Sequence, residues 1–229
     1  MRSIYIQQAD RFGWGIQSQL NRDIVSVLEK FAKGPRVIDI GCGGGQYVDY
    51  LNKKGFFTVG VDFINEFLSS ALKYKREGHF VCADAEVIPF KDKTFDTVFS
   101  SNLLEHIKDD NRIIKEFFRI AKSRIILIVP LVEPAEFKGY GVLFFHRIDE
   151  THLRYYTRED ILNLLKDFRC EVLYYEEFFP VDITGLFIST IPHYFLKKFF
   201  IAIIYFLKIF LKIRFKKYYT GAKVVINIK

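Results

Sequence analysis

A glycine-rich stretch is the part of the sequence best suited to hold a ligand. The run Val37-Ile-Asp-Ile-Gly41-Cys-Gly43-Gly-Gly45 follows an apolar segment and opens a helical pattern. In such a turn, backbone N–H groups and the helix N-terminus contact a ligand directly. A dinucleotide fingerprint, G-x-G-x-x-G, requires glycine at its sixth place, where Gln46 stands. The tighter spacing favours a ligand that lies flat across the turn without a pyrophosphate.

Aspartates stand at the ends of three successive apolar segments. Asp39 precedes the first glycine by two residues, Asp62 ends Val59-Gly-Val-Asp62, and Asp84 follows the next apolar run. A carboxylate at the second position can accept both hydroxyls of a ribose, and one at the third can reach an adenine amino group. Because parallel strands end at one edge of a sheet, these acids indicate a nucleoside site at that edge.

Alternating strand and helix patterns predict the elements that position these residues. The buried strands are predicted at 36–40, 56–61, 79–82, 95–100 and 124–129, with two more at 170–175 and 223–228. Helical spacing is found at 16–31, 46–54, 64–74 and 111–121. Thr157 and Asp160 resemble the start of a further helix, with Thr157 as N-cap. Such alternation predicts an α/β, doubly wound, mostly parallel sheet with helices on both faces.

Four motifs in order resemble one family. VIDIGCGGG (37–45), VGVDF (59–63), CADAEVIPF (82–90) and TFDTVFSSNLLEHI (94–107) resemble the class I S-adenosylmethionine-dependent methyltransferases. The similarity is greatest to the small-molecule, type 11-like branch, with LEH after the fourth strand. It runs from Val37 to Val129 and resumes at 152–157 and in the final strands. It implies a Rossmann-like seven-stranded sheet whose last strand is antiparallel.

The resemblance also implies a cofactor and its contacts. S-adenosyl-L-methionine would lie with its methionine half on the glycine turn, its ribose on Asp62 and its adenine beside Phe63. Asp84 and Ala85 would lie at the adenine edge, and Ser101 and Asn102 near the methionine amine. The residues expected to bind the cofactor are Asp39, Gly41, Gly43, Gly45, Asp62, Phe63, Asp84, Ala85, Ser101 and Asn102.

Methyl transfer from a sulfonium needs no dedicated base, because positioning and desolvation supply much of the rate. His146 and His152 are nevertheless the candidate catalytic residues, since residues 131–156 should form a lid over the acceptor. Some relatives that act on quinone precursors carry a Glu-x-x-Glu-His metal cluster after the fourth strand. Here Asn102 replaces its first glutamate, so we expect no metal.

The positive charge belongs to one end of the chain. The formal net charge is +7, but residues 1–182 hold 25 Lys and Arg against 27 Asp and Glu. The other nine basic residues lie in 183–229, which has no acid. The body therefore lacks the positive face that nucleic acid requires, and nucleic acid is not an expected partner.

Residues 183–221 form an unusual insert between the last two predicted strands. Its longest uninterrupted apolar run, Phe199–Leu207, is nine residues long, whereas a membrane span needs about twenty. On a helix over 193–217, five lysines fall on one stripe opposite many Phe and Ile side chains; they are Lys197, Lys198, Lys208, Lys212 and Lys216. This pattern favours a helix in the plane of an anionic membrane. The alternative is packing against protein.

The chain is thus expected to form one domain. It would comprise an N-terminal helical cap (1–34), a cofactor-binding core (35–130), the lid (131–156), the insert (183–221) and a final strand (222–229). The predicted function is methyl transfer to a small-molecule acceptor, lipid-linked or glycan. The alternatives are a non-catalytic S-adenosylmethionine-binding protein and a dinucleotide-dependent oxidoreductase. The three unpaired cysteines and the lack of an apolar leader favour the cytoplasm, with peripheral contact to the inner face of the membrane. The oligomeric state is not predicted.

Overall fold

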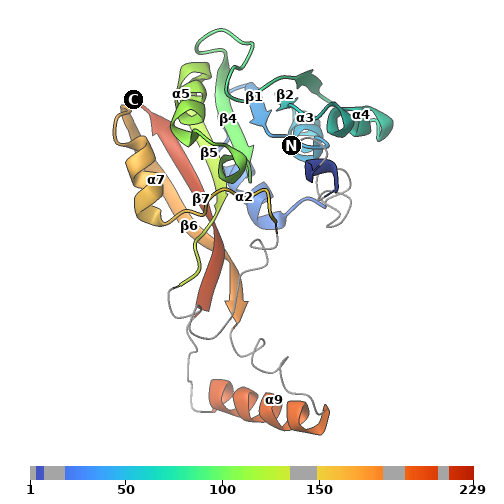
Figure 1. Cartoon of the computed structure of the whole chain (residues 1–229), viewed down its shortest axis with the longest axis vertical. Helices are drawn as coiled ribbons and strands as arrows, with labels where there is room; N and C mark the ends of the chain where they lie inside the picture. The colour runs from blue at the N-terminus through green and yellow to red at the C-terminus, as the bar shows by residue number, and fades with distance from the viewer. Residues whose placement is uncertain (1–3, 8–18, 135–148, 183–193, 211–216) are drawn as a thin grey trace.

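The protein is built on a seven-stranded sheet. The structure, a computed structural model, describes residues 4–7, 19–134, 149–182, 194–210 and 217–229. The strand order is β3-β2-β1-β4-β5-β7-β6 (Figure 1). The first five strands pair in parallel, and β7 pairs antiparallel with both β5 and β6. The predicted doubly wound sheet with an antiparallel last strand is therefore confirmed.

The strands begin and end close to their predicted limits, except in the last hairpin. They are β1 (Arg36–Ile40), β2 (Phe57–Asp62), β3 (His79–Cys82), β4 (Phe95–Ser101), β5 (Ala121–Pro130), β6 (Cys170–Asp182) and β7 (Lys217–Ile228). The prediction was wrong for β6, which continues to Asp182, and for β7, which begins at Lys217 and not at 222 or 223. Asp182 pairs with Lys217, so β6 and β7 continue as a two-stranded ribbon. Pairing between the two strands satisfies the backbone N–H and C=O groups of the ribbon. The ribbon therefore needs no alternation of buried side chains, which is the pattern that a sequence-based strand prediction depends on.

Helices cover both faces of the sheet. On one face lie α2 (Arg22–Phe31) and α3 (Gln46–Lys53), and α4 (Asn65–Lys73) packs beside α3. On the other lie α5 (Asp110–Ile120) and α7 (Arg158–Leu165). β5 serves both cores, because Ile126 and Ile128 face α2 while Ile125 and Leu127 face α5. The predicted cap of Thr157 on Asp160 is present as a capping box.

The first long helix starts later than predicted. The pattern from residue 16 predicted a helix there, but α2 begins at Arg22 after the N-cap Asn21. The Asn21 side chain accepts hydrogen bonds from the backbone N–H groups of Asp23 and Ile24, at 2.9 and 3.2 Å. An asparagine with extended backbone is a strong helix start, which fixes the boundary there.

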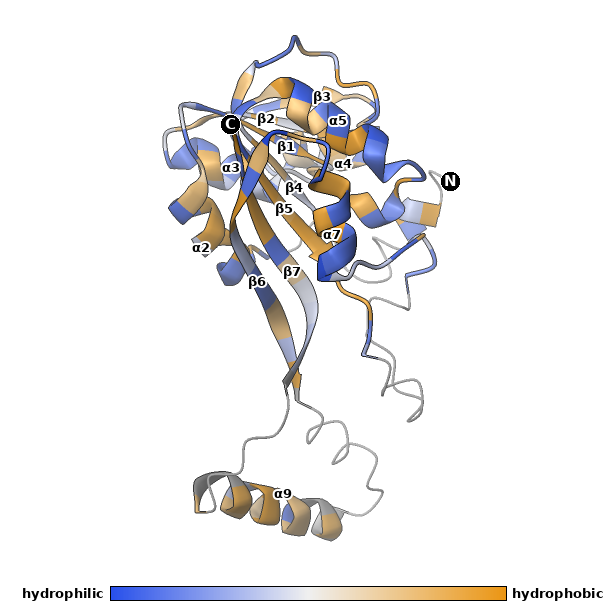
Figure 2. Ribbon diagram, turned by 90° about the vertical axis from the view of Figure 1, so that its left-hand side faces the viewer, coloured by the Kyte–Doolittle hydropathy of each residue, from blue (hydrophilic) through white to orange (hydrophobic). Residues whose placement is uncertain are grey.

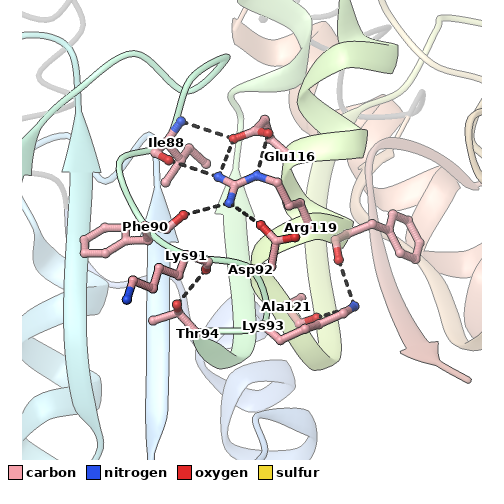
Figure 3. Close-up of polar contacts among 10 residues, drawn as sticks. Ile88, Phe90, Lys91, Asp92, Lys93, Thr94, Glu116, Arg119 and Ala121 are labelled. Atoms are coloured by element: carbon pink, nitrogen blue, oxygen red, sulfur yellow. Dashed lines mark hydrogen bonds and ion pairs between the residues drawn. The ribbon is translucent and has the colours of Figure 1, made fainter.

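The connection from β3 to β4 is held by one arginine of α5 (Figure 3). The Arg119 guanidinium donates to the carbonyl oxygens of Ile88 and Phe90, at 3.0 and 2.7 Å. It also pairs with Asp92 at 2.9 Å and with both oxygens of Glu116 at 2.8 Å. All five of its N–H donors are used in this way. The network fixes the segment that follows Asp84.

The helix α9 (Tyr194–Ile209) lies away from the sheet, beyond the end of the β6–β7 ribbon (Figures 1 and 2). Most of its described side chains are apolar and exposed, and the ribbon of α9 in Figure 2 is coloured mostly as hydrophobic. Among the described helices, none is long and apolar enough to cross a membrane.

Candidate active site

A cavity of about 560 Å³ opens at the carboxyl ends of the parallel strands. It is lined by nine of the ten residues predicted to bind the cofactor: Asp39, Gly41, Gly43, Asp62, Phe63, Asp84, Ala85, Ser101 and Asn102. Gly45 does not line it. That glycine is the N-cap of α3 with φ +79°, and a Cβ there would lie 2.3 Å from the ring of Phe80. Gly45 therefore shapes the turn from behind.

The glycine turn is tied to β2 by its backbone. The N–H groups of Gly41 and Cys42 both donate to the carbonyl oxygen of Val61, at 2.8 and 3.0 Å. Asp62 then accepts from the N–H of Gly43 and the N–H of Ile64, each at 2.9 Å. Burial raises the pKa of Asp62, and these backbone hydrogen bonds oppose that rise. Asp62 thus fixes the turn while its carboxylate lines the cavity.

The buried carboxylate of Asp39 has spare hydrogen-bonding capacity. Its Oδ2 atom has no hydrogen-bond partner among the described residues, although it lies in the wall of the cavity. Burial, and to a smaller degree the charge of Asp62, raise the pKa of Asp39 well above its usual value. An orphaned buried acceptor beside a tight glycine turn fits a ligand that carries a hydrogen-bond donor, such as the ammonium group of a methionine moiety.

An N-terminal residue reaches over this wall. Tyr5 packs edge-on against Phe63 at 5.5 Å between ring centroids and against His106 at 5.4 Å. It thereby links the residue expected beside the adenine to the histidine of the LEH motif. The sequence analysis missed Tyr5, because residues 4–7 carry no motif and their contacts are all distant in the chain.

Glu105, His106, Asp149 and His152 line the same cavity as the predicted cofactor residues. His152 Nε2 lies 3.5 Å from Asp149 Oδ2 and 4.0 Å from Glu105 Oε1. The rings of His106 and His152 pack at 4.7 Å between centroids. Thr151 Oγ1 lies 3.0 Å from His106 Nδ1 and also contacts Asp149. The group joins the end of β4 to the segment before α7.

Glu105 is the most unusual member of this group. Its side chain is fully buried, and neither carboxylate oxygen has a hydrogen-bond partner among the described residues. Burial, with a contribution from the charge of Asp149, raises the pKa of Glu105 to about 8. Burial also lowers the pKa of His106, which favours a neutral ring. The cavity therefore holds groups that can take up or release a proton near neutral pH.

The two predicted catalytic histidines have different outcomes. His152 lines the cavity, whereas His146 lies outside the described residues, as does most of the expected lid. Glu105, His106 and His152 each offer a ligand atom, and these atoms lie within 4.8 Å of one another. The prediction of no metal considered only Glu105 and His106, so it stays a prediction.

Two aromatic residues of β6 complete the wall. Phe178 and Phe179 line the cavity together with Thr220 and Gly221 of β7. Sequence analysis missed them because β6 was predicted to end at Tyr175. No local motif marks them, and the β6–β7 pairing alone brings them to the site.

Comparison with known proteins agrees with the motifs. Residues 38–129 match a family described as a methyltransferase domain. The ubiquinone biosynthesis O-methyltransferase of Coxiella burnetii is 30% identical over 141 residues, which is 58% of this chain and 53% of that protein. The human mitochondrial arginine-hydroxylase NDUFAF5 is 38% identical over 98 residues, 41% of this chain and 28% of that protein. The chain thus spans about half the length, or less, of these curated relatives.

Solved structures share the fold. A putative methyltransferase from Bacillus halodurans has a TM-score of 0.64 at 18% identity, covering 90% of this chain and 98% of that one. Magnesium protoporphyrin IX methyltransferase from Synechocystis, solved with bound SAH, has a TM-score of 0.64 at 16% identity, covering 97% and 95%. The motif match at 38–129, the strand order and the glycine turn agree with one another. Residues 38–129 are therefore similar to the methyltransferase-domain family, and the sheet has the fold of solved S-adenosylmethionine-dependent methyltransferases, a resemblance that supports S-adenosylmethionine as the cofactor.

Proposed function

We propose that this protein transfers the methyl group of S-adenosylmethionine to a hydroxyl group of a small, lipid-linked acceptor. The observation that carries the proposal is the shared cavity, lined both by the glycine turn with its acids and by the group around His152. The relatives named as ubiquinone biosynthesis O-methyltransferases support oxygen as the methylated atom.

The bound cofactor would supply an electrophilic methyl group on a sulfonium, so the protein has mainly to bind, orient and dehydrate the reactants. In this proposal Asp62, Asp39 and the glycine turn hold the cofactor. His152 takes the proton of the acceptor hydroxyl, since the Asp149 carboxylate lies 3.5 Å from its Nε2 atom and favours the charged ring. Tyr5 packs on Phe63 at the wall of the cavity and excludes water there.

A turnover assay tests the enzymatic role. We expect S-adenosylhomocysteine to accumulate when the protein is given its acceptor, which mass spectrometry can identify among compounds that co-purify with and without detergent. Binding of S-adenosylmethionine with no turnover in the presence of that compound would favour a binding protein. Tighter binding of NADH than of S-adenosylhomocysteine would favour the oxidoreductase alternative.

A pair of His152 variants tests the proton acceptor. His152→Gln should lower kcat by about a hundredfold, since general-base catalysis contributes roughly 10²- to 10⁴-fold, while the Kd for S-adenosylmethionine stays unchanged. The matched control is His79→Gln, at the exposed start of β3. The loss should be smaller at high pH, where the hydroxyl ionises without help. If His152→Gln keeps its full kcat with the true acceptor, positioning alone carries the chemistry.

The second part of the proposal is contact between residues 193–217 and an anionic membrane surface. Phe199 and Phe206 of α9 are 61% and 51% exposed, and Leu196, Ile201, Ile203 and Tyr205 are exposed as well. A helix with this much exposed apolar surface is stabilised by burying it in lipid. Sixteen residues reach only about 24 Å, less than the ~30 Å hydrocarbon core, which favours a helix in the plane of the membrane.

Flotation with anionic vesicles tests this contact. The protein should float at low salt, since each lysine near an anionic surface contributes about 1 kcal/mol within a Debye length of ~8 Å. A quadruple change to Glu should abolish flotation without changing cofactor affinity; it combines Lys197, Lys198, Lys208 and Lys212. The control quadruple change uses exposed lysines of the body: Lys75, Lys91, Lys115 and Lys166. Failure of the unchanged protein to float would remove the membrane from the proposal and leave methyl transfer intact.

A further inference from the structure

The cavity has an aromatic end that the chemistry of methyl transfer does not require. Phe178 and Phe179 lie there, where the β6–β7 ribbon leaves the sheet. Phe178 is buried and faces the backbone of Gly221, where a Cβ would lie 2.7 Å from its ring. The Lys223 ammonium lies 5.1 Å from the centre of the same ring. Phe178 is therefore a fixed part of the wall.

Phe179 is different because its backbone is strained. Its φ of +56° is in the left-handed region, which a bulky side chain rarely adopts. Its side chain is 43% exposed and yet lines the cavity, and its ring lies 4.3 Å from that of Phe178. Glycine would adopt this backbone at lower energy. A strained residue whose ring contributes little to the core indicates that the ring has a contact outside the fold.

The position of these rings suggests what that contact is. The group around His152 and the two phenylalanines line one cavity. From Phe179 the ribbon continues through the pair Asp182–Lys217, and α9 lies beyond its end (Figures 1 and 2). A molecule with its reacting group at His152 and an apolar chain directed along the ribbon would have that chain against Phe179.

We infer that Phe179 is a specificity-determining residue that contacts the apolar chain of an amphiphilic acceptor, with Phe178 as the fixed wall behind it. The inference rests on the proposed function and goes beyond it, because it states that one residue, Phe179, makes the protein bind acceptors with an apolar chain more tightly than acceptors without one. An acceptor of this class has a polar head that fits at the His152 group and a chain of several methylenes that leaves toward α9.

Catechols with a 4-alkyl chain of one to six carbons, used below their micellar concentrations, test the inference. Their Kd is measured by calorimetry on the whole protein with S-adenosylhomocysteine bound, and their methylation is followed with radiolabelled S-adenosylmethionine. Each methylene that reaches the wall should lower Kd about three- to fourfold. Phe179→Gly should reduce that factor to below about 1.5, with the Kd of 4-methylcatechol unchanged within about twofold and with no loss of thermal stability.

The control is Phe206→Ser in α9, which should keep the dependence on chain length although it weakens membrane contact. The inference is overturned if Kd does not depend on chain length in the unchanged protein, or if Phe179→Gly has the same dependence. Methylation of 4-methylcatechol without any chain dependence would leave the proposed function intact. Chain-dependent binding that Phe179→Gly abolishes, with no catechol methylated, would support the inference and count against catechol hydroxyls as acceptors.

Discussion

The two sides of the cavity are built in different ways. The side proposed to bind the cofactor, here the cofactor side, consists of turns at the ends of β1, β2 and β3, and hydrogen bonds such as that from Gly43 to Asp62 hold them together. The acceptor side is assembled from distant segments: residues 4–7, the end of β4, residues 149–156 and the base of the β6–β7 ribbon. The cofactor side is thus a local motif, whereas the acceptor side depends on tertiary contacts; there, neither carboxylate oxygen of Glu105 has a hydrogen-bond partner among the described residues.

Because the Glu105 carboxyl is buried on the acceptor side, the protein should become less stable as pH rises. The pKa of Glu105, raised to about 8, means that the folded protein keeps a proton that the unfolded chain loses above pH ~4.5. This stabilisation is complete below pH ~4.5 and is lost as pH rises through 8, by roughly 5 kcal/mol in total. Asp149, Tyr5 and Tyr156 interact electrostatically with Glu105, His106 interacts with Asp149, and His152 Nε2 lies 4.0 Å from Glu105 Oε1.

Thermal unfolding from pH 5 to pH 9, in buffer with a chelator, measures this effect. Glu105→Gln should unfold at a nearly constant temperature over that range and become more stable than the unchanged protein at pH 8. The control is Glu159→Gln, at an exposed position of α7, which should behave like the unchanged protein. If the unfolding temperatures of all three proteins depend on pH in the same way, burial of Glu105 is not the cause of that dependence.

The cofactor side should be sensitive to a single carboxylate. Asp62→Ala removes the acceptor of two backbone hydrogen bonds and the expected partner of the ribose. Because each lost buried partner costs about 1–3 kcal/mol, the Kd for S-adenosylmethionine should rise about ten- to a hundredfold in calorimetry. Asp167→Ala, a change at an exposed position two residues after α7, should leave Kd unchanged. A folded Asp62→Ala protein with normal affinity would remove Asp62 from the site.

Loss of the Arg119 hydrogen bonds should lower both the stability of the protein and, to a smaller degree, its affinity for the cofactor. Arg119→Lys cannot reproduce the five hydrogen bonds to the segment after Asp84 and to Glu116. We expect a loss of about 2 kcal/mol, or roughly 5 °C in Tm, with a smaller loss of cofactor affinity. Arg112, on the same helix, forms a surface ion pair with Glu86 at 3.4 Å. Arg112→Lys should therefore lower the free energy of unfolding by less than ~0.5 kcal/mol. Equal Tm values for the two variants would contradict the role of the network.

The smallest effect on stability is expected in α9. Phe199→Ser changes an exposed side chain and should shift the free energy of unfolding by no more than about 0.5 kcal/mol. Phe117→Ala in the buried face of α5 should cost about 3–5 kcal/mol. Urea unfolding of the two variants compares them. A large loss in Phe199→Ser would mean that α9 packs on protein, the alternative to membrane contact.

The sequence by itself determined the fold class, most element limits and the cofactor side, because these depend on contacts between residues close in the chain. Strand and helix patterns place Asp39, Asp62 and Asp84 at one edge of a parallel sheet without knowledge of the rest. Only the tertiary structure decided which residues complete the cavity. Tyr5, Phe178 and Phe179 carry no local signal for this site, and each reaches it through contacts between segments far apart in the sequence. The periodicity of apolar residues predicts which face of a helix or strand is buried, but not which distant element covers that face. The residues that line the acceptor side of the cavity can therefore be identified only from the folded structure.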